Sequence, residues 1–216
     1  MIRLAVLAES EADAKAVHIL TRGILGAETE RTAGDWELPL GWPHIKDVAR
    51  KAIRVCHERN LADGLVLVAD SDDDPIHAAD GGHLGGKADE CRFCQLQNIA
   101  RKAVESLRLT GGHRPPQVAI AIATPTIEAW YLCGRSSIAN EEACLNALKA
   151  GNTSKALRLR LKKDVYGSDR VGRHKQFLRA VEEAERLCGD LAQLEHCFPR
   201  GFGTFAMQLR AWKSEW

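Results

Sequence analysis

Acidic side chains stand at or just after the ends of three apolar segments of this chain. Glu9 follows the first segment directly, Asp70 ends the second, and Glu128 stands shortly after the third. Carboxylates that gather in one place repel one another and raise one another's pKa unless a divalent cation neutralises them. Oxygen ligands without sulfur or imidazole among them favour Mg²⁺ or Mn²⁺. The pattern therefore indicates metal-assisted chemistry if the three segments are neighbours in the fold.

Other acids nearby have a simpler explanation when each is taken alone. Glu11 and Asp13 open a predicted helix, where negative charge complements the positive end of the helix dipole. Asp73 and Asp74 lie in a predicted loop, where water would solvate them, and Glu128 could also serve as a helix-start acid. The acids placed directly at the ends of apolar strands are harder to explain by solubility alone.

The alternation of apolar runs and helical periods predicts an α/β fold with a mostly parallel sheet flanked by helices. Continuous apolar runs are typical of strands that helices cover on both faces. The expected strands are residues 2–8, 64–70 and 117–123, with one further short strand within 27–43. The expected helices are residues 9–25, 44–59, 91–108 and one that starts within 126–133. Ligands of such sheets bind outside the carboxyl ends of the strands, which is where the acids would meet.

The pattern of the chain changes near residue 133. Residues 1–133 form the predicted α/β domain, and a long Gly/Asp/His loop spans residues 70–90 within it. Loops of that length inside compact domains are usually functional or mobile. From residue 140 onward only helical signals occur, so residues 134–216 are predicted to form a helical region packed on the sheet.

The net charge of +1 hides a strong asymmetry along the chain. Residues 58–90 contain nine acids and two bases, whereas residues 149–179 contain ten bases and two acids. A basic flank beside an acidic centre suits a bound polyanion such as nucleic acid, and a solvated helical face explains the basic block nearly as well. The candidate nucleic-acid-binding residues are Lys155, Arg158, Arg170, Arg173 and Lys175.

The composition is that of an ordinary globular protein. The 216 residues are 45% hydrophobic and 27% charged, which excludes disorder and a fibrous class. No run approaches the roughly 18 apolar residues of a membrane span. Seven cysteines, an odd number, suit reduced thiols better than a disulfide framework. We therefore expect a cytoplasmic protein with no membrane partner.

Three short motifs follow the three predicted strands. They read E-S-E-A-D at residues 9–13, D-S-D at 70–72 and P-T-I-E-A-W at 125–130. In this order, over residues 2–133, they resemble the TOPRIM fold that topoisomerases, bacterial primases and OLD-type nucleases share. The E-x-x-x-D spacing and the P-x-x-E-A-W element are most similar to stand-alone TOPRIM-like proteins found near bacterial defence systems.

The resemblance implies roles for the acids. It implies that Glu9 is a metal ligand or general acid/base, that Asp13 is the extra acid of the OLD-type branch, and that Glu128 serves a second metal. The implied metal ligands are Glu9, Asp13, Asp70, Asp72 and Glu128, of which Glu9, Asp70 and Asp72 are the implied catalytic residues. The family commonly has glycine after the first glutamate, whereas this chain has Ser10, whose side chain narrows access to the backbone.

The chemistry expected of such a site is attack of water on a phosphodiester, assisted by one or two Mg²⁺ or Mn²⁺ ions. The resemblance thus implies a nuclease, a hydrolase of nucleic acid, that acts in phage defence, with a possible protein partner encoded alongside. Two other functions stay open. One is a non-catalytic TOPRIM-like partner that binds nucleic acid or protein. The other is a receiver-like signalling module with Asp70 as the phosphorylation site, although the long loop argues against it.

The loop at residues 70–90 and the start of the next helix contain a second set of candidate ligands. His77, His83, Cys91 and Cys94 together form a set that tetrahedral zinc would accept, and a zinc ion would pin the loop beside the acidic edge. Alternatively, the cysteines face the core from the first turns of the helix while the histidines lie near substrate. A histidine could also donate a proton there, because it titrates near neutrality.

Overall fold

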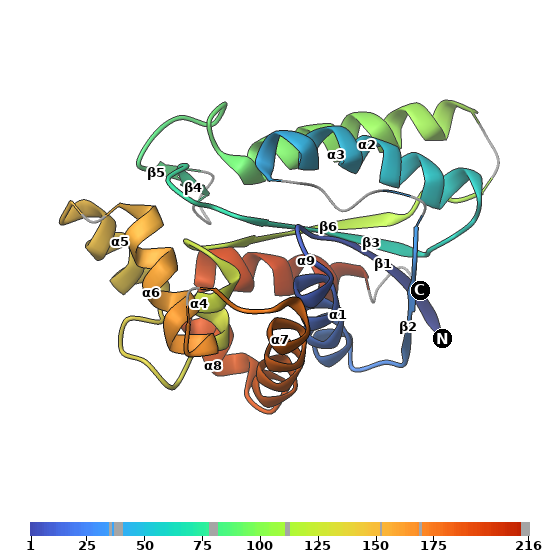
Figure 1. The fold of residues 1–216 in the computed structure, drawn as a ribbon. Helices are drawn as coiled ribbons and strands as arrows, with labels where there is room; N and C mark the ends of the chain where they lie inside the picture. The colour runs from blue at the N-terminus through green and yellow to red at the C-terminus, as the bar shows by residue number, and fades with distance from the viewer. Residues whose placement is uncertain are drawn as a thin grey trace.

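A four-stranded, all-parallel sheet forms the middle layer of the protein, and helices cover both of its faces (Figure 1). Its strands are, in spatial order, β2 (Thr29–Thr32), β1 (Ile2–Leu7), β3 (Gly64–Asp70) and β6 (Gln117–Ala123). This computed structural model describes residues 1–34, 36, 41–77, 82–110, 113–151, 153–168 and 170–212. The predicted α/β class with a mostly parallel sheet flanked by helices is confirmed.

Side chains of the strands alternate between two apolar cores because successive residues of a strand point to opposite faces. Leu65 and Leu67 face the core under α2 (Trp42–Glu58) and α3 (Arg92–Thr110). Val66 and Val68 face the other core, under α1 and the carboxy-terminal helices. Burial on both faces explains why the strand sequence is apolar throughout.

The second core joins the amino-terminal and carboxy-terminal parts of the chain. The helices of this side are α1 (Glu11–Leu25), α4 (Ile127–Tyr131), α5 (Glu141–Lys149), α6 (Ser154–Tyr166), α7 (Arg173–Cys188), α8 (Leu191–Cys197) and α9 (Thr204–Trp212), with a π-helical turn at Pro199–Gly203. Helix α7 packs along α1, and α9 packs under β6 (Figure 1). Phe202, Phe205 and Trp130 are fully buried where these elements meet.

The predicted strands and helices are found with small shifts at their ends, and β2 is the short strand expected within residues 27–43. The loop at residues 70–90 differs from the prediction, because it contains a small antiparallel hairpin of β4 (Ile76–His77) and β5 (His83–Leu84). Two-residue strands carry too little sequence pattern to be predicted. Residues 78–81 of this loop lie outside the described residues. Among the helices of the described residues, none is both long and apolar enough to span a membrane.

Candidate metal centre

The carboxyl ends of β1, β3 and β6 bring acids from three separate segments to one edge of the sheet. Strands β1 and β3 are direct neighbours, and so are β3 and β6. Glu9, Asp13 and Asp70 line one small pocket there, together with apolar residues that include Ala8 and Ile127. Glu9 and Asp70 therefore face the same space, as the sequence predicts. The expected convergence of acids at one edge is found for these three residues.

Asp70 is held by the turn that leads from β6 into α4. Its Oδ2 accepts a hydrogen bond from the Thr126 hydroxyl at 2.8 Å, and its Oδ1 accepts one from the backbone N–H of Ile127 at 3.0 Å. Each carboxylate oxygen has two acceptor positions, so each keeps one after these contacts. Asp70 thus has a structural role at the start of α4 and retains capacity for a further ligand.

The Thr126 hydroxyl also lies within hydrogen-bond distance of Glu128 Oε2. A hydroxyl has a single proton to donate, yet two carboxylates approach it here. Glu128 is only 2% exposed, and Lys162 of α6 approaches its other oxygen at 3.9 Å. Glu128 therefore belongs to the acidic cluster rather than to the solvated surface of α4.

Asp13 is tied to the first turn of α1 and to α4. Ser10 is the N-cap residue of α1: its hydroxyl accepts from the Asp13 backbone N–H at 3.1 Å and donates to Asp13 Oδ2 at 2.6 Å. The Tyr131 hydroxyl lies 3.4 Å from Asp13 Oδ1. Serine at position 10 therefore caps the helix and orients Asp13, which glycine could not do through a side chain.

Asp72 lies beyond the end of β3 in a left-handed backbone conformation, with φ of 51°. Arg92 of α3 forms an ion pair with its Oδ2 at 2.9 Å, and Arg158 of α6 pairs with its Oδ1. Arg92, which is 7% exposed, also pairs with Asp74 and donates to the Asp70 carbonyl at 2.6 Å. The D-S-D segment is therefore clamped between two arginines from different helices.

The pKa values of the clustered acids show how tightly they are packed. Burial, and then the charge of Glu128, raise the pKa of Asp13 from 3.8 to about 7. Burial, and then the charges of Glu128 and Asp13, raise the pKa of Asp70 well above its ordinary value. Partial burial of the Glu9 carboxylate, and then the charge of Asp72, raise the pKa of Glu9 as well.

The charges of the cluster do not balance when every acid is ionised. The five acids are Glu9, Asp13, Asp70, Asp72 and Glu128. Three basic side chains act on them within the described part of the chain, namely Arg92, Arg158 and Lys162, and Arg92 is shared with Asp74. Bound protons or a divalent cation would supply the missing positive charge.

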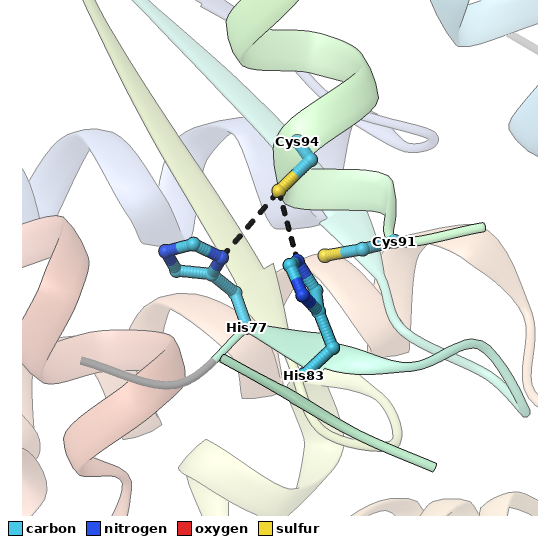
Figure 2. Close-up of side chains that lie close together, drawn as sticks. All are labelled: His77, His83, Cys91 and Cys94. Atoms are coloured by element: carbon cyan, nitrogen blue, oxygen red, sulfur yellow. Dashed lines mark hydrogen bonds between the residues drawn. The ribbon is translucent and has the colours of Figure 1, made fainter. Parts of the chain in front are cut away.

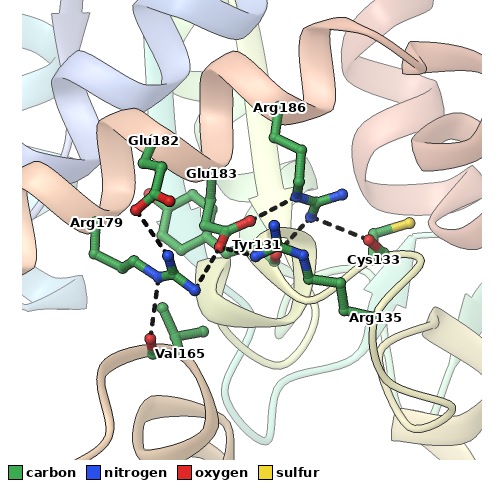
Figure 3. A network of polar contacts seen from close by, with 8 residues as sticks. All are labelled: Tyr131, Cys133, Arg135, Val165, Arg179, Glu182, Glu183 and Arg186. Atoms are coloured by element: carbon green, nitrogen blue, oxygen red, sulfur yellow. Dashed lines mark hydrogen bonds and ion pairs between the residues drawn. The ribbon is translucent and has the colours of Figure 1, made fainter.

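A buried ion network fixes α4, which carries Glu128, against α7 (Figure 3). Glu183 of α7 is 2% exposed and pairs with three arginines, of which Arg186 also donates to the backbone carbonyls of Tyr131 and Cys133 at 2.8 and 3.1 Å. Those carbonyls lie at the end of α4, where helical carbonyl groups lack intrahelical partners. The network therefore sets the position of the helix that supplies one acid of the cluster.

The five predicted nucleic-acid-binding residues do not behave as one group. Arg158 is engaged by Asp72 at the acidic cluster. The other four are exposed: Lys155 lies on α6, Arg170 lies on the segment before α7, and Arg173 and Lys175 lie on the first turn of α7. Arg92, Lys162 and Tyr131 also face the cluster, although they are not among the predicted site residues. Lys162 stands one helical turn after Arg158, a spacing that could have indicated it.

The four predicted zinc ligands also come together. His77, His83, Cys91 and Cys94 offer ligand atoms that all lie within 4.8 Å of one another (Figure 2). This cluster stands at the amino-terminal end of α3, next to Arg92.

No protein-family model, curated protein or solved structure matches the chain. Function is therefore inferred from the residues and from their geometry.

Proposed function

We propose that this protein is a Mg²⁺- or Mn²⁺-dependent nuclease that hydrolyses phosphodiester bonds of nucleic acid at the acidic edge of its sheet. The observation that carries the proposal is the shared pocket of Glu9, Asp13 and Asp70. Three carboxylates lining one space, within a cluster whose acids outnumber their basic partners, favour a divalent cation once the acids ionise. All candidate ligands are oxygen atoms, which Mg²⁺ and Mn²⁺ prefer.

In this function Glu9 and Asp70 would hold the cation, with Asp13 in the same pocket and with Glu128 and Asp72 as the remaining acids of the cluster. A bound divalent cation lowers the pKa of its water and stabilises charge on the leaving oxygen. Thr126 and the Ile127 N–H keep Asp70 oriented, so its remaining acceptor positions point to a fixed place. Lys162 stands near enough to Glu128 to offset charge there, and it would attract a phosphate once the acids are neutralised.

The substrate class follows from the surroundings of this edge. Lys155 lies in the first turn of α6, the same helix that supplies Arg158 and Lys162 to the cluster. A phosphate backbone that follows α6 would therefore pass from exposed basic residues to the acidic pocket. The resemblance to TOPRIM-like proteins supports a TOPRIM-like core with a carboxy-terminal helical lobe, a cytoplasmic protein, a role in phage defence and a partner encoded alongside.

A second candidate function is a non-catalytic partner that binds nucleic acid without cleaving it. The contacts of Asp70 favour this alternative, because both of its oxygens already accept hydrogen bonds from the turn before α4. In that case protons on the acids would replace the cation.

Calorimetric titration with Mn²⁺, combined with cleavage assays, separates the two functions. Labelled single- and double-stranded DNA and RNA would be incubated with Mg²⁺, Mn²⁺ or EDTA. The test variants are Asp70→Asn and Glu9→Gln, which keep side-chain size and remove charge. The matched control is Glu11→Gln, because Glu11 lies two residues from Glu9 but its carboxylate pairs with Arg31 of β2.

We expect Mn²⁺ to bind the wild type and the control, and cleavage to fall in both test variants. Loss of a residue outside the ligand sphere costs roughly 10–100-fold in metal sites, so loss of a ligand should exceed that range. Cleavage that persists in both test variants would refute the catalytic assignment. Binding of nucleic acid without metal and without turnover would favour the non-catalytic partner instead.

A further inference from the structure

The cluster of His77, His83, Cys91 and Cys94 is separate from the acidic pocket and has the composition of a metal site. The four side chains come from the β4–β5 hairpin and from the start of α3, and their ligand atoms converge (Figure 2). Within the described residues, it is the one group of three or more His, Cys, Asp or Glu side chains whose ligand atoms already stand close enough together for one ion. The three acids of the pocket would have to move closer together for all of them to share an ion.

The distances suit a single tetrahedral ion. Cys94 Sγ lies 3.1 Å from His83 Nε2 and 3.5 Å from His77 Nδ1. With metal–sulfur and metal–nitrogen bonds of ordinary length, the ligand atoms of a tetrahedral zinc stand roughly 3.3–3.8 Å apart. Small side-chain movements would bring all four atoms into that range. Two cysteines and two histidines can also hold a two-iron cluster, in which the cysteines bind one iron and the histidines bind the other. The short distances from Cys94 Sγ to both histidine nitrogens do not suit ligands of two different irons.

The hairpin needs a source of stability other than its own strands. Each strand has two residues, and His77 pairs with His83 across them. An isolated two-stranded hairpin is at best marginally stable in water, even when it is longer than this one. The His77 ring stacks on Phe93 with 4.5 Å between centroids, which supplies one apolar contact. A metal that joins both histidines to α3 would supply the cross-link.

The cysteines are available as ligands. Both are free thiols; Cys91 is 1% exposed, whereas Cys94 and both histidines are partly exposed, which leaves a path for an ion. Without a cation, burial and then the charge of Cys91 raise the pKa of Cys94 to about 11. Metal binding would therefore release protons as thiolates form.

We propose that His77, His83, Cys91 and Cys94 bind one structural Zn²⁺. This ion fixes the start of α3 and, through Arg92, the acidic loop at residues 70–74, which begins with the D-S-D segment. Two imidazoles and two thiolates fill all four positions of a tetrahedral zinc, so the site is closed and has no position for substrate. Arg92 stands between the two cysteines, and its guanidinium contacts Asp72, Asp74 and the Asp70 carbonyl. Zinc at this place thus acts on the positioning of the D-S-D segment, independently of whether that segment is catalytic.

The first test is metal analysis of the full-length protein purified without chelator. We expect one zinc per chain after exhaustive dialysis. Replacement of zinc by Co²⁺ should produce the visible bands of tetrahedral cobalt together with a thiolate-to-cobalt charge-transfer band. A zinc content near zero in protein purified with zinc supplied, and no thiolate band with Co²⁺, would overturn the proposal without the use of any variant.

Three variants locate the ion. Cys94→Ser should lower the zinc content from one per chain to near zero and abolish the charge-transfer band. Cys188→Ser is the matched control, because Cys188 is also a partly exposed thiol but donates to the Ile19 carbonyl on α1. Asp70→Asn should keep both zinc and the band, which separates this site from the acidic pocket. Equal zinc in Cys94→Ser and Cys188→Ser would overturn the assignment.

The link to Arg92 is tested by hydrogen exchange of the wild type with zinc and after chelation. We expect chelation to speed exchange of backbone amides in residues 71–77 and 91–95, while amides of β1 and α1 stay unchanged. Unchanged exchange in residues 71–77 would show that zinc does not hold the acidic loop, and would overturn that part of the proposal.

Discussion

Neutralising Asp13 should stabilise the metal-free protein much more at alkaline pH than at acidic pH. The carboxyl of Asp13 has a pKa raised from 3.8 to about 7 by burial and by the charge of Glu128. The folded state therefore keeps a proton that the unfolded chain has lost between those two pH values. Because the folded state binds more protons, this group contributes stability below about pH 4, and the contribution is lost as pH rises through about 7.

The magnitude follows from the size of the shift. Each pKa unit corresponds to 1.36 kcal/mol, so a shift of about three units means up to about 4 kcal/mol of stability lost in EDTA between acidic pH and pH 8. Asp13→Asn keeps the shape of the side chain and does not ionise. We therefore expect the variant to exceed the wild type by up to about 4 kcal/mol at pH 8, and by only up to about 2 kcal/mol at pH 5, where the unfolded chain has already lost most of its proton.

Urea unfolding in EDTA at pH 5 and pH 8 measures both differences. A third series at pH 8 with saturating Mn²⁺ tests the metal site, because a ligand that binds only the folded state stabilises it. Mn²⁺ should raise the stability of the wild type more than that of Asp13→Asn. If the variant is destabilised equally at both pH values, electrostatic crowding of Asp13 does not exist and the reasoning is wrong.

Two further predictions concern the packing that positions the acids. Glu183→Ala should lower the free energy of unfolding in urea by about 3–5 kcal/mol, because three arginines lose their buried partner. Glu182→Ala, which removes an exposed carboxylate next to it, should lower that free energy by less than about 1 kcal/mol. Equal losses in the two variants would contradict a special role for the network. Gly201→Ala should cost about 1–3 kcal/mol, since its new Cβ would lie 2.5 Å from the Ile122 carbonyl oxygen. Gly172→Ala, which meets open space, should stay within about 1 kcal/mol of wild type, and thermal unfolding that ranks the two in the opposite order would refute the steric explanation.

Local pattern was sufficient for the strands of the main sheet, for the long helices and for the place of the candidate site, but not for the two-residue strands β4 and β5. The strand at Gly64–Asp70 could be predicted because seven residues of almost unbroken apolar character need burial on both faces. Acids that follow parallel strands must lie at the same edge when those strands are neighbours, so the meeting of Glu9 and Asp70 was predictable in outline. The helices α6 and α7 followed from apolar positions at helical spacing.

The partners of the acids were decided by tertiary structure alone. Arg92 reaches Asp72 from a helix 20 positions later in the chain, and Tyr131 reaches Asp13 over 118 positions, so no local pattern connects them. His77 and His83 of the β4–β5 hairpin likewise meet the two cysteines only because the start of α3 packs beside the hairpin. Periodicity reports which face of an element is buried, but it does not report which other element covers that face. The amino-acid sequence by itself therefore determined that carboxylates gather at one edge of a parallel sheet. The packing of α3, α4 and α6 around that edge decided which arginine, lysine and hydroxyl side chains contact those carboxylates.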